Sequence, residues 1–190
     1  RQDKLILYIL TSFIKGIAAS MVILNNAVEH NAFIEATCIL ANQVDALLRI
    51  GIVLKSQLIN RNNKIAKRWI CQGVNDKKIS EKDVYIEAKS LGIIDDELYN
   101  KLIALYEDRN RVIHRFIISE ITFNEVEHIT FHYYQISNEI NSRIYKIEQE
   151  QIEAGVGMTA VDKNGNFKEL LDRWVNDKLG KLSYFEDELK

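Results

Sequence analysis

Proline is absent from the 190-residue chain, and cysteine and glycine are scarce, with two and eight residues respectively. Because proline is the strongest helix breaker, its absence lets long segments run as uninterrupted helix. Cys38 and Cys71 stand at no metal-like spacing and offer no disulfide framework, which indicates a reducing compartment. We therefore expect a cytoplasmic protein.

Excess charge is also lacking, since the formal net charge is −2. A global electrostatic attraction to nucleic acid is therefore excluded, and any such contact must depend on a local basic patch. The apolar stretch 5–24 raises the question of a membrane span, but Lys15 interrupts it, and small and polar residues dilute it. We interpret this stretch as a core helix and expect no membrane partner.

What the chain does contain is helical periodicity along almost its whole length, with hardly any strand-like alternation. Residues 2–29 and 31–60 predict two long helices that are separated near His30. Residues 60–79 are polar and basic, with a short amphipathic piece at 69–70. These features favour an all-α protein.

Polar residues at helix starts mark three further helices. The segments 80–83 and 122–125 have the form of capping boxes, with a hydroxyl side chain at the N-cap and an acid at the third helical position. They predict helices that reach about Leu91 and about Glu153. Asp95 is the expected cap of a helix that runs to about Ile118.

The predicted fold is an all-α bundle of about five helices over residues 1–154. Residues 155–190 form a C-terminal appendage, in which the pattern predicts a turn at 162–166 and an amphipathic helix at Phe167–Leu179.

Arg109 occupies a position on the predicted helix 95–118 where an apolar residue is expected. On a helical wheel of about 100° per residue it lies in the middle of the apolar stripe. The stripe consists of Leu98, Leu102, Leu105, Val112 and Phe116. A charged group there must be paired or must line a cavity, because its desolvation alone is costly. One interpretation is a structural ion pair, for which Asp45 is a candidate partner.

A second, semi-apolar strip lies beside the first on the same helix, and Asn110 and His114 are neighbours on it, one turn apart. The other members of this strip are Tyr99, Ile103, Tyr106, Ile117 and Ile121. A helix that is apolar over more than half its circumference is either central or lies at an interface with another subunit.

The run 108–116, Asp-Arg-Asn-Arg-Val-Ile-His-Arg-Phe, resembles the signature of the HEPN superfamily. That signature is an arginine followed by a polar residue, usually asparagine, and then a histidine between one and two helical turns after the arginine. The upstream segment EAKSLGIIDDELYNKLIALYEDRN resembles the helix–loop–helix that commonly leads into this motif. As an architecture, the similarity covers roughly residues 1–153.

This resemblance implies a metal-independent endoribonuclease of the toxin–antitoxin or antiviral defence type, with one composite cleft formed across a homodimer. Arg109 would contact the scissile phosphate and stabilise its charge, and His114 would be the general base or acid. Asn110 would orient the histidine or hold the phosphate. Arg111 and Arg115 lie outside the apolar arc and are expected to bind neighbouring RNA phosphates.

Histidine and arginine suit a reaction in which RNA supplies its own 2′-hydroxyl nucleophile, so no metal or other cofactor is expected. An antitoxin or regulatory protein is a further possible partner. Some toxin members of the superfamily carry a tyrosine two residues after the histidine that a partner nucleotidyltransferase modifies. Phe116 stands at that position here, which places this route of neutralisation in doubt.

Two other classes of function stay open. A non-catalytic module of the same shape would bind a nucleotide or a partner protein through the same cleft. A purely structural bundle would pair Arg109 with an acid and keep it away from solvent.

Other candidate sites carry weaker signals. The set Glu125, His128 and His132 lies opposite an apolar stripe, which favours a solvated face over a metal site. The segment that begins at Asp162 does not fit a calcium loop, because its glycine is two positions too early and Arg173 stands where the loop needs a glutamate. The basic cluster 64–68 with Trp69 is either a nucleic-acid platform or, more commonly, a solvated loop.

Overall fold

The computed structural model describes residues 2–161, with the side chains of residues 8–160, and within that range it contains helices but no strand. The helices are α1 (Gln2–Glu29), α2 (Phe33–Asn60), α3 (Lys67–Ile70), α4 (Glu81–Ser90), α5 (Asp96–Arg115), α6 (Phe123–Ala154) and the 3-10 helix η1 (Met158–Val161). The predicted all-α class is confirmed. The turn 162–166 and the helix Phe167–Leu179 that the sequence predicts lie outside the described residues.

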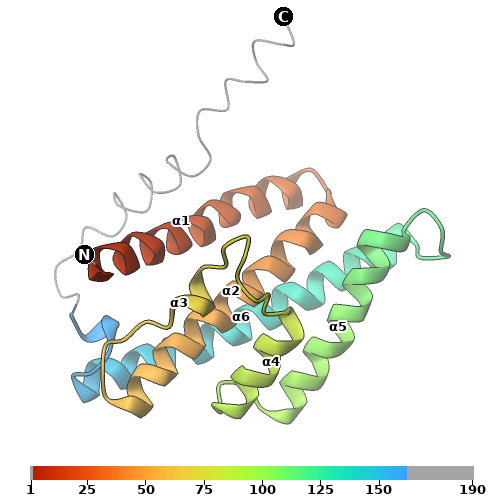
Figure 1. Cartoon of the computed structure of the whole chain (residues 1–190). Helices are drawn as coiled ribbons and strands as arrows, with labels where there is room; N and C mark the ends of the chain where they lie inside the picture. Colours follow the sequence, from red (N-terminus) through yellow and green to blue (C-terminus); the bar gives the residue numbers. More distant parts are fainter. Residues whose placement is uncertain (1, 162–190) are drawn as a thin grey trace, which may run out of the picture.

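Helix α2 is the central element, since it packs along α6 and also contacts α1, α3, α4 and α5 (Figure 1). Its buried face includes Leu40, Leu48 and Ile52, which belong to a continuous apolar core. A Cβ atom on Gly51 would lie 3.3 Å from Ile144 of α6, so the glycine allows the two helices to approach closely. The burial of this face is what makes α2 the core helix of the bundle.

The helix boundaries follow local chemistry. Both capping boxes are present, at the start of α4 and at the start of α6. The Asp95 carboxylate accepts a hydrogen bond from the Leu98 N–H and caps α5. Helix α5 ends at Arg115 rather than near Ile118, because the exposed Ile117 and Ile118 make too little packing contact to continue it.

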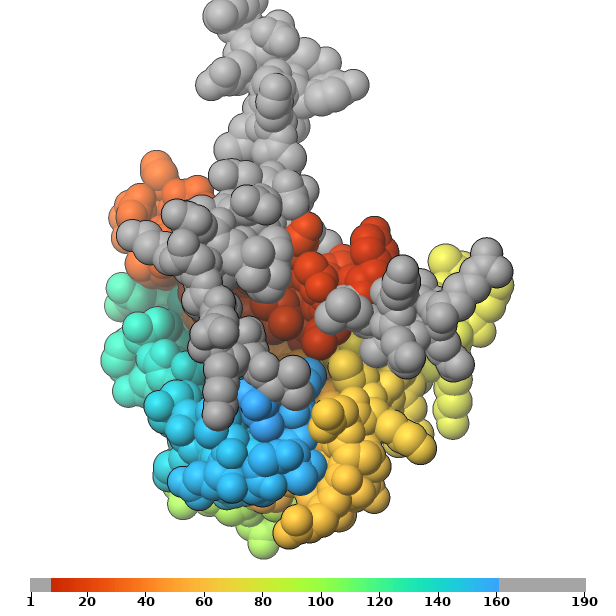
Figure 2. Space-filling model, turned by 90° about the vertical axis from the view of Figure 1, so that its left-hand side faces the viewer, coloured from red at the N-terminus to blue at the C-terminus, as the bar shows by residue number. Residues whose placement is uncertain are grey.

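Residues after α6 fold back onto the end of the bundle. Gln151 is fully buried, and its amide donates to the Leu54 carbonyl at 2.8 Å. The Gly157 N–H donates to Asn63 Oδ1 at 2.8 Å, which ties η1 to the α2–α3 connection. In Figure 2 the blue end of the described chain lies against the gold segment near the end of α2.

Helix α1 is less buried than a core helix. It packs along α2, where the buried Gln43 donates to Ser20 Oγ at 3.0 Å. Of its apolar window Tyr8–Glu29, however, only 11% is buried, against 61% for the window in α2. By length and composition alone, both helices could cross a membrane. The expectation that the stretch 5–24 is a core helix is therefore wrong, because α1 is a peripheral helix with apolar side chains on its surface.

Candidate functional site

Helix α5 carries all the predicted site residues, and its orientation is determined by its apolar stripe. Leu98, Leu102 and Val112 are buried against the core. Acidic residues occupy the first turn, and His114 and Arg115 occupy the last, in the sense that the helix dipole favours. Because this apolar stripe faces the core, the polar residues between Tyr106 and Arg115 lie at the surface of the bundle or near it.

Four of the five predicted residues come together in one open hollow of about 520 Å³. Its lining consists of Tyr106, Glu107, Asn110, Arg111, His114 and Arg115. The imidazole of His114 is exposed, while Asn110 is half-buried one turn earlier. The hollow therefore combines a group that can transfer protons, an amide and two guanidinium groups.

Arg109 does not line this hollow, because it points toward helix α4. Its guanidinium forms an ion pair with the carboxylate of Glu81, and the two side chains are only 18% and 15% exposed. The guanidinium also lies over the ring of Tyr106, 4.9 Å from its centroid. The suggestion of Asp45 as its partner is wrong, since Asp45 pairs with Arg49 at 2.6 Å.

The ion pair is part of a polar cluster inside the bundle. The Tyr85 hydroxyl donates to the second oxygen of Glu81. Burial raises the pKa of Glu81, and the contacts with Tyr85 and Arg109 oppose that rise. Burial likewise raises the pKa of Tyr133, whose hydroxyl donates to the Leu105 carbonyl at 3.0 Å. The cluster thus joins α4, α5 and α6 through hydrogen bonds.

One polar atom of this cluster has no partner among the described residues: Nε of Arg109 is buried without an acceptor. The sequence indicates that Arg109 stands where an apolar residue is expected, but it does not identify Glu81 and Tyr85 as its neighbours. The capping box placed Glu81 in the first turn of α4, but nothing local indicates that this turn faces α5. A purely structural bundle predicts that Arg109 is paired with an acid and largely buried, and this arrangement is observed.

The charges beside His114 are not equivalent. Arg111 pairs with Asp108 at 3.1 Å and lies 3.8 Å from Glu125. Within the described part of the chain, Arg115 forms no salt bridge. Arg115 is therefore the cation beside His114 whose charge the described acids leave uncompensated.

The other candidates from the sequence are placed as follows. Glu125 accepts hydrogen bonds from Thr122 in the capping box, and His128 and His132 are exposed on α6. Among residues 8–160, no group of three His, Cys, Asp or Glu side chains converges as a metal site would require. Trp69 is only 6% exposed, so it does not offer an open face for base stacking.

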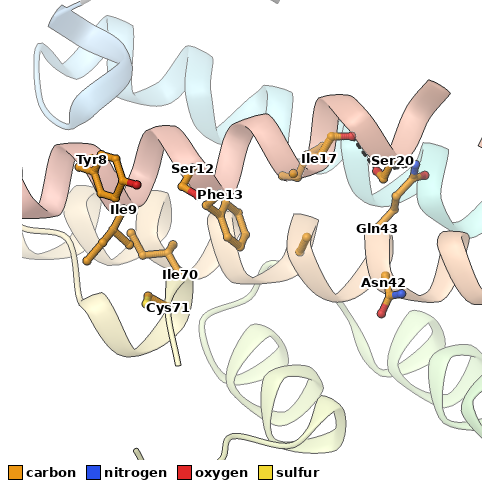
Figure 3. A pocket seen from close by; sticks show the side chains of 12 residues that line it. Tyr8, Ile9, Ser12, Phe13, Ile17, Ser20, Asn42, Gln43, Ile70 and Cys71 are labelled. Atoms are coloured by element: carbon orange, nitrogen blue, oxygen red, sulfur yellow. Dashed lines mark hydrogen bonds between the residues drawn. The ribbon is translucent and has the colours of Figure 1, made fainter. Parts of the chain in front are cut away.

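A second hollow, of about 470 Å³, is an apolar groove between α1, α2 and α3 (Figure 3). Its walls include Phe13 and Ile17 of α1, Ala46 of α2 and Ile70 at the end of α3. Its lining contains no Asp, Glu, Lys, Arg or His side chain, and Tyr8 and Cys71 are its only lining side chains of a kind that acts in acid–base chemistry. The hollow on α5 is the better candidate for chemistry.

No protein-family model, curated protein or solved structure matches this chain, so its site is interpreted from its own residues and their contacts.

Proposed function

We propose that the protein is a metal-independent endoribonuclease of the toxin–antitoxin or antiviral defence type, working in the cytoplasm. The observation that carries the proposal is that His114, Asn110 and Arg115 share one open hollow on a single helix. The resemblance of the run 108–116 to the HEPN signature supports the same conclusion.

The chemistry requires three things of the site. A base removes the proton from the ribose 2′-hydroxyl, whose oxygen attacks the adjacent phosphorus, and an acid protonates the leaving 5′-oxygen as its bond to phosphorus breaks. A cation stabilises the additional negative charge on the phosphorane. The products are a 2′,3′-cyclic phosphate and a 5′-hydroxyl, and no metal or cofactor enters the balance.

We assign proton transfer to His114, which is exposed and has the only imidazole of the hollow. Asn110 lies one turn away and orients the imidazole or the phosphate. Arg115 and Arg111 supply positive charge. Arg109 contacts a phosphate only if that phosphate displaces the Glu81 carboxylate, and otherwise it positions α5 against α4.

A second copy of the chain completes the site in this proposal. The end of the bundle beside His114 exposes several apolar side chains, with Ile117 at 94% and Ile118 at 81% exposure. Ile113 and Phe123 extend this apolar surface. Exposed apolar surface beside a functional hollow is typical of an interface, and a twofold dimer through it would bring two His114 side chains together.

The test compares two histidine variants of the full chain. His114→Ala should reduce cleavage of single-stranded RNA at least a hundredfold, the scale of general acid–base catalysis. His132→Ala, which removes another exposed histidine, on α6, should leave cleavage unchanged. EDTA should have no effect on either protein. Equal cleavage by the two variants would refute the assignment.

One observation favours a non-catalytic module instead: Glu81 already neutralises Arg109, so the arginine that the motif makes central is engaged within the chain. Such a module would bind a nucleotide or a partner protein at the same hollow. It predicts no cleavage of any RNA, together with nucleotide binding that His114→Ala weakens. Calorimetry with mononucleotides separates the two functions.

A further inference from the structure

The connection between α2 and α4 is strongly basic in a chain that is acidic overall. Residues 61–78 contain six Lys or Arg residues and one Asp, a net charge of +5, whereas the whole chain carries −2. The remainder of the chain therefore carries −7. Such a local concentration of one charge attracts polyanions even when the net charge does not.

The structure gathers these cations around a hollow of about 700 Å³, the basic pocket, between α3 with the following connection and the first turns of α4. Lys67, Arg68, Lys77 and Lys78 line it. None of the four forms a salt bridge within residues 8–160. Ile79 and Ile86 add apolar surface, and the volume is typical of a small-ligand site.

Three acids also line the basic pocket, but two of them are engaged locally. A carboxylate oxygen of Asp76 accepts the Gly73 N–H at 2.7 Å, and Asp83 caps α4 through Ser80. These carboxylates hold the backbone of the connection and of the helix start. With Glu87 as the third acid, four cations face three carboxylates in this lining, and the cations exceed the acids by one.

The pocket is fixed in place from inside the bundle. Arg49 of α2, which is only 9% exposed, donates to the Trp69 carbonyl at 3.4 Å and to the Ile79 carbonyl at 3.2 Å. It thereby ties both ends of the 69–79 segment to the core, while its pair with Asp45 holds the guanidinium itself. A pre-positioned wall loses less conformational entropy when a ligand binds.

The basic pocket and the hollow on α5 are neighbours across the start of α4. Asp83 of α4 lines the basic pocket, whereas Lys82, the residue before it, pairs with Glu107 of the α5 hollow at 2.9 Å. Lys82 also lies over the ring of Tyr106, 4.5 Å from its centroid. Figure 1 shows the connection, α4 and α5 on the near side of the bundle. Since a helix is about 10 Å across, a short stretch of a nucleic-acid chain is long enough to reach from one hollow to the other.

We infer that the basic pocket binds the phosphates of the RNA strand that flanks the cleavage position, so that one substrate strand passes from the α5 hollow across the start of α4. This inference rests on the proposed function, since it names the second contact of the same substrate. Phosphate contacts of this kind position the strand without reading its sequence. The expected substrate is therefore single-stranded RNA with little base preference in its flanking segment.

The experiment measures RNA binding as a function of salt. A labelled, unstructured single-stranded RNA is titrated with the full chain carrying His114→Ala, so that the RNA stays intact, from about 50 to about 200 mM salt. Adding Lys67→Ala and Lys78→Ala removes one cation from each wall of the pocket. The matched control removes two exposed lysines elsewhere, Lys101→Ala and Lys146→Ala, with the same change in charge.

Each lost phosphate contact should lower the slope of log affinity against log salt by about 0.7. The pocket variant should therefore lose about 1.4 in slope and bind about 25-fold more weakly at about 0.1 M salt, while the control changes little. If the unaltered protein binds and cuts RNA, equal slopes for the pocket variant and the control would overturn this inference alone. Absence of both binding and cleavage in the unaltered protein would overturn the proposed function as well.

Discussion

Replacing Arg109 with methionine leaves the carboxylate of Glu81 buried without its cation. Loss of one partner of a buried ion pair costs about 3–5 kcal/mol. Both side chains are slightly exposed and Tyr85 still donates to Glu81, so we expect the lower end, about 3 kcal/mol. For a chain of this size the melting temperature should then fall by about 6–12 °C.

A double-mutant cycle isolates the pair. Replacing both Arg109 and Glu81 with methionine removes both charges, and an apolar pair of similar volume often restores stability. Because the hydroxyl of Tyr85 then loses its acceptor, recovery should be partial, with a coupling energy of about 2 kcal/mol. Urea unfolding followed by circular dichroism measures each corner of the cycle. Arg143→Met, which breaks partly exposed ion pairs with Asp95 and Glu139, serves as the control and should cost much less.

The pH dependence adds a second signature. Burial already holds the pKa of Glu81 above its usual 4.5, and without Arg109 it should rise further. A carboxyl group whose pKa is raised by folding disfavours the folded state once pH rises through that raised value. The penalty is absent when the group is protonated in both states. The difference between Arg109→Met and the unaltered protein should therefore shrink as pH falls from neutral toward the usual carboxyl pKa of 4.5.

Losses below about 1 kcal/mol that simply add in the double variant would refute this account of the pair. The same proteins separate structure from chemistry. If Arg109 acts only by positioning α5, the stable double variant should regain RNA cleavage. If Arg109 binds a phosphate after exchange with Glu81, the double variant should stay inactive while Glu81→Gln cuts at least as fast as the unaltered protein.

Three further predictions follow from other parts of the fold. Gly157→Ala should destabilise by about 2–5 kcal/mol, because an added Cβ would lie 2.1 Å from a buried glutamine side chain and the backbone φ is +93°. Gly155→Ala, with φ of +62° and open space, should cost only about 1–2 kcal/mol in the same urea titration. Replacing Ile117 and Ile118 with aspartate should convert a dimer to monomers in sedimentation, and dimers that persist would remove this surface as the interface. Burial raises the pKa of Glu148, so Glu148→Gln should gain stability relative to the unaltered protein as pH rises above about 5, and a pH-independent difference would contradict that cause.

Much of the fold is predictable because it depends on neighbours in sequence. The boundaries of α1, α2 and α6 and both capping boxes agree with expectation. Each depends on contacts within a few residues or on the period of apolar side chains. The end of α5 was predicted about one turn too late, since Ile117 and Ile118 continue the apolar pattern but are exposed, whereas Phe116 packs against the core.

The sequence by itself determined that Arg109 interrupts an apolar stripe and that Asn110 and His114 are neighbours on one face of the same helix. Helical geometry alone requires this. Only the tertiary structure decided that Glu81, and not Asp45, receives the guanidinium, and that the same arginine points away from the histidine hollow. It also decided that Trp69 is buried while the cations around it line a pocket. These outcomes depend on how α4 and its connection are rotated against α2 and α5, which no local pattern of residues specifies.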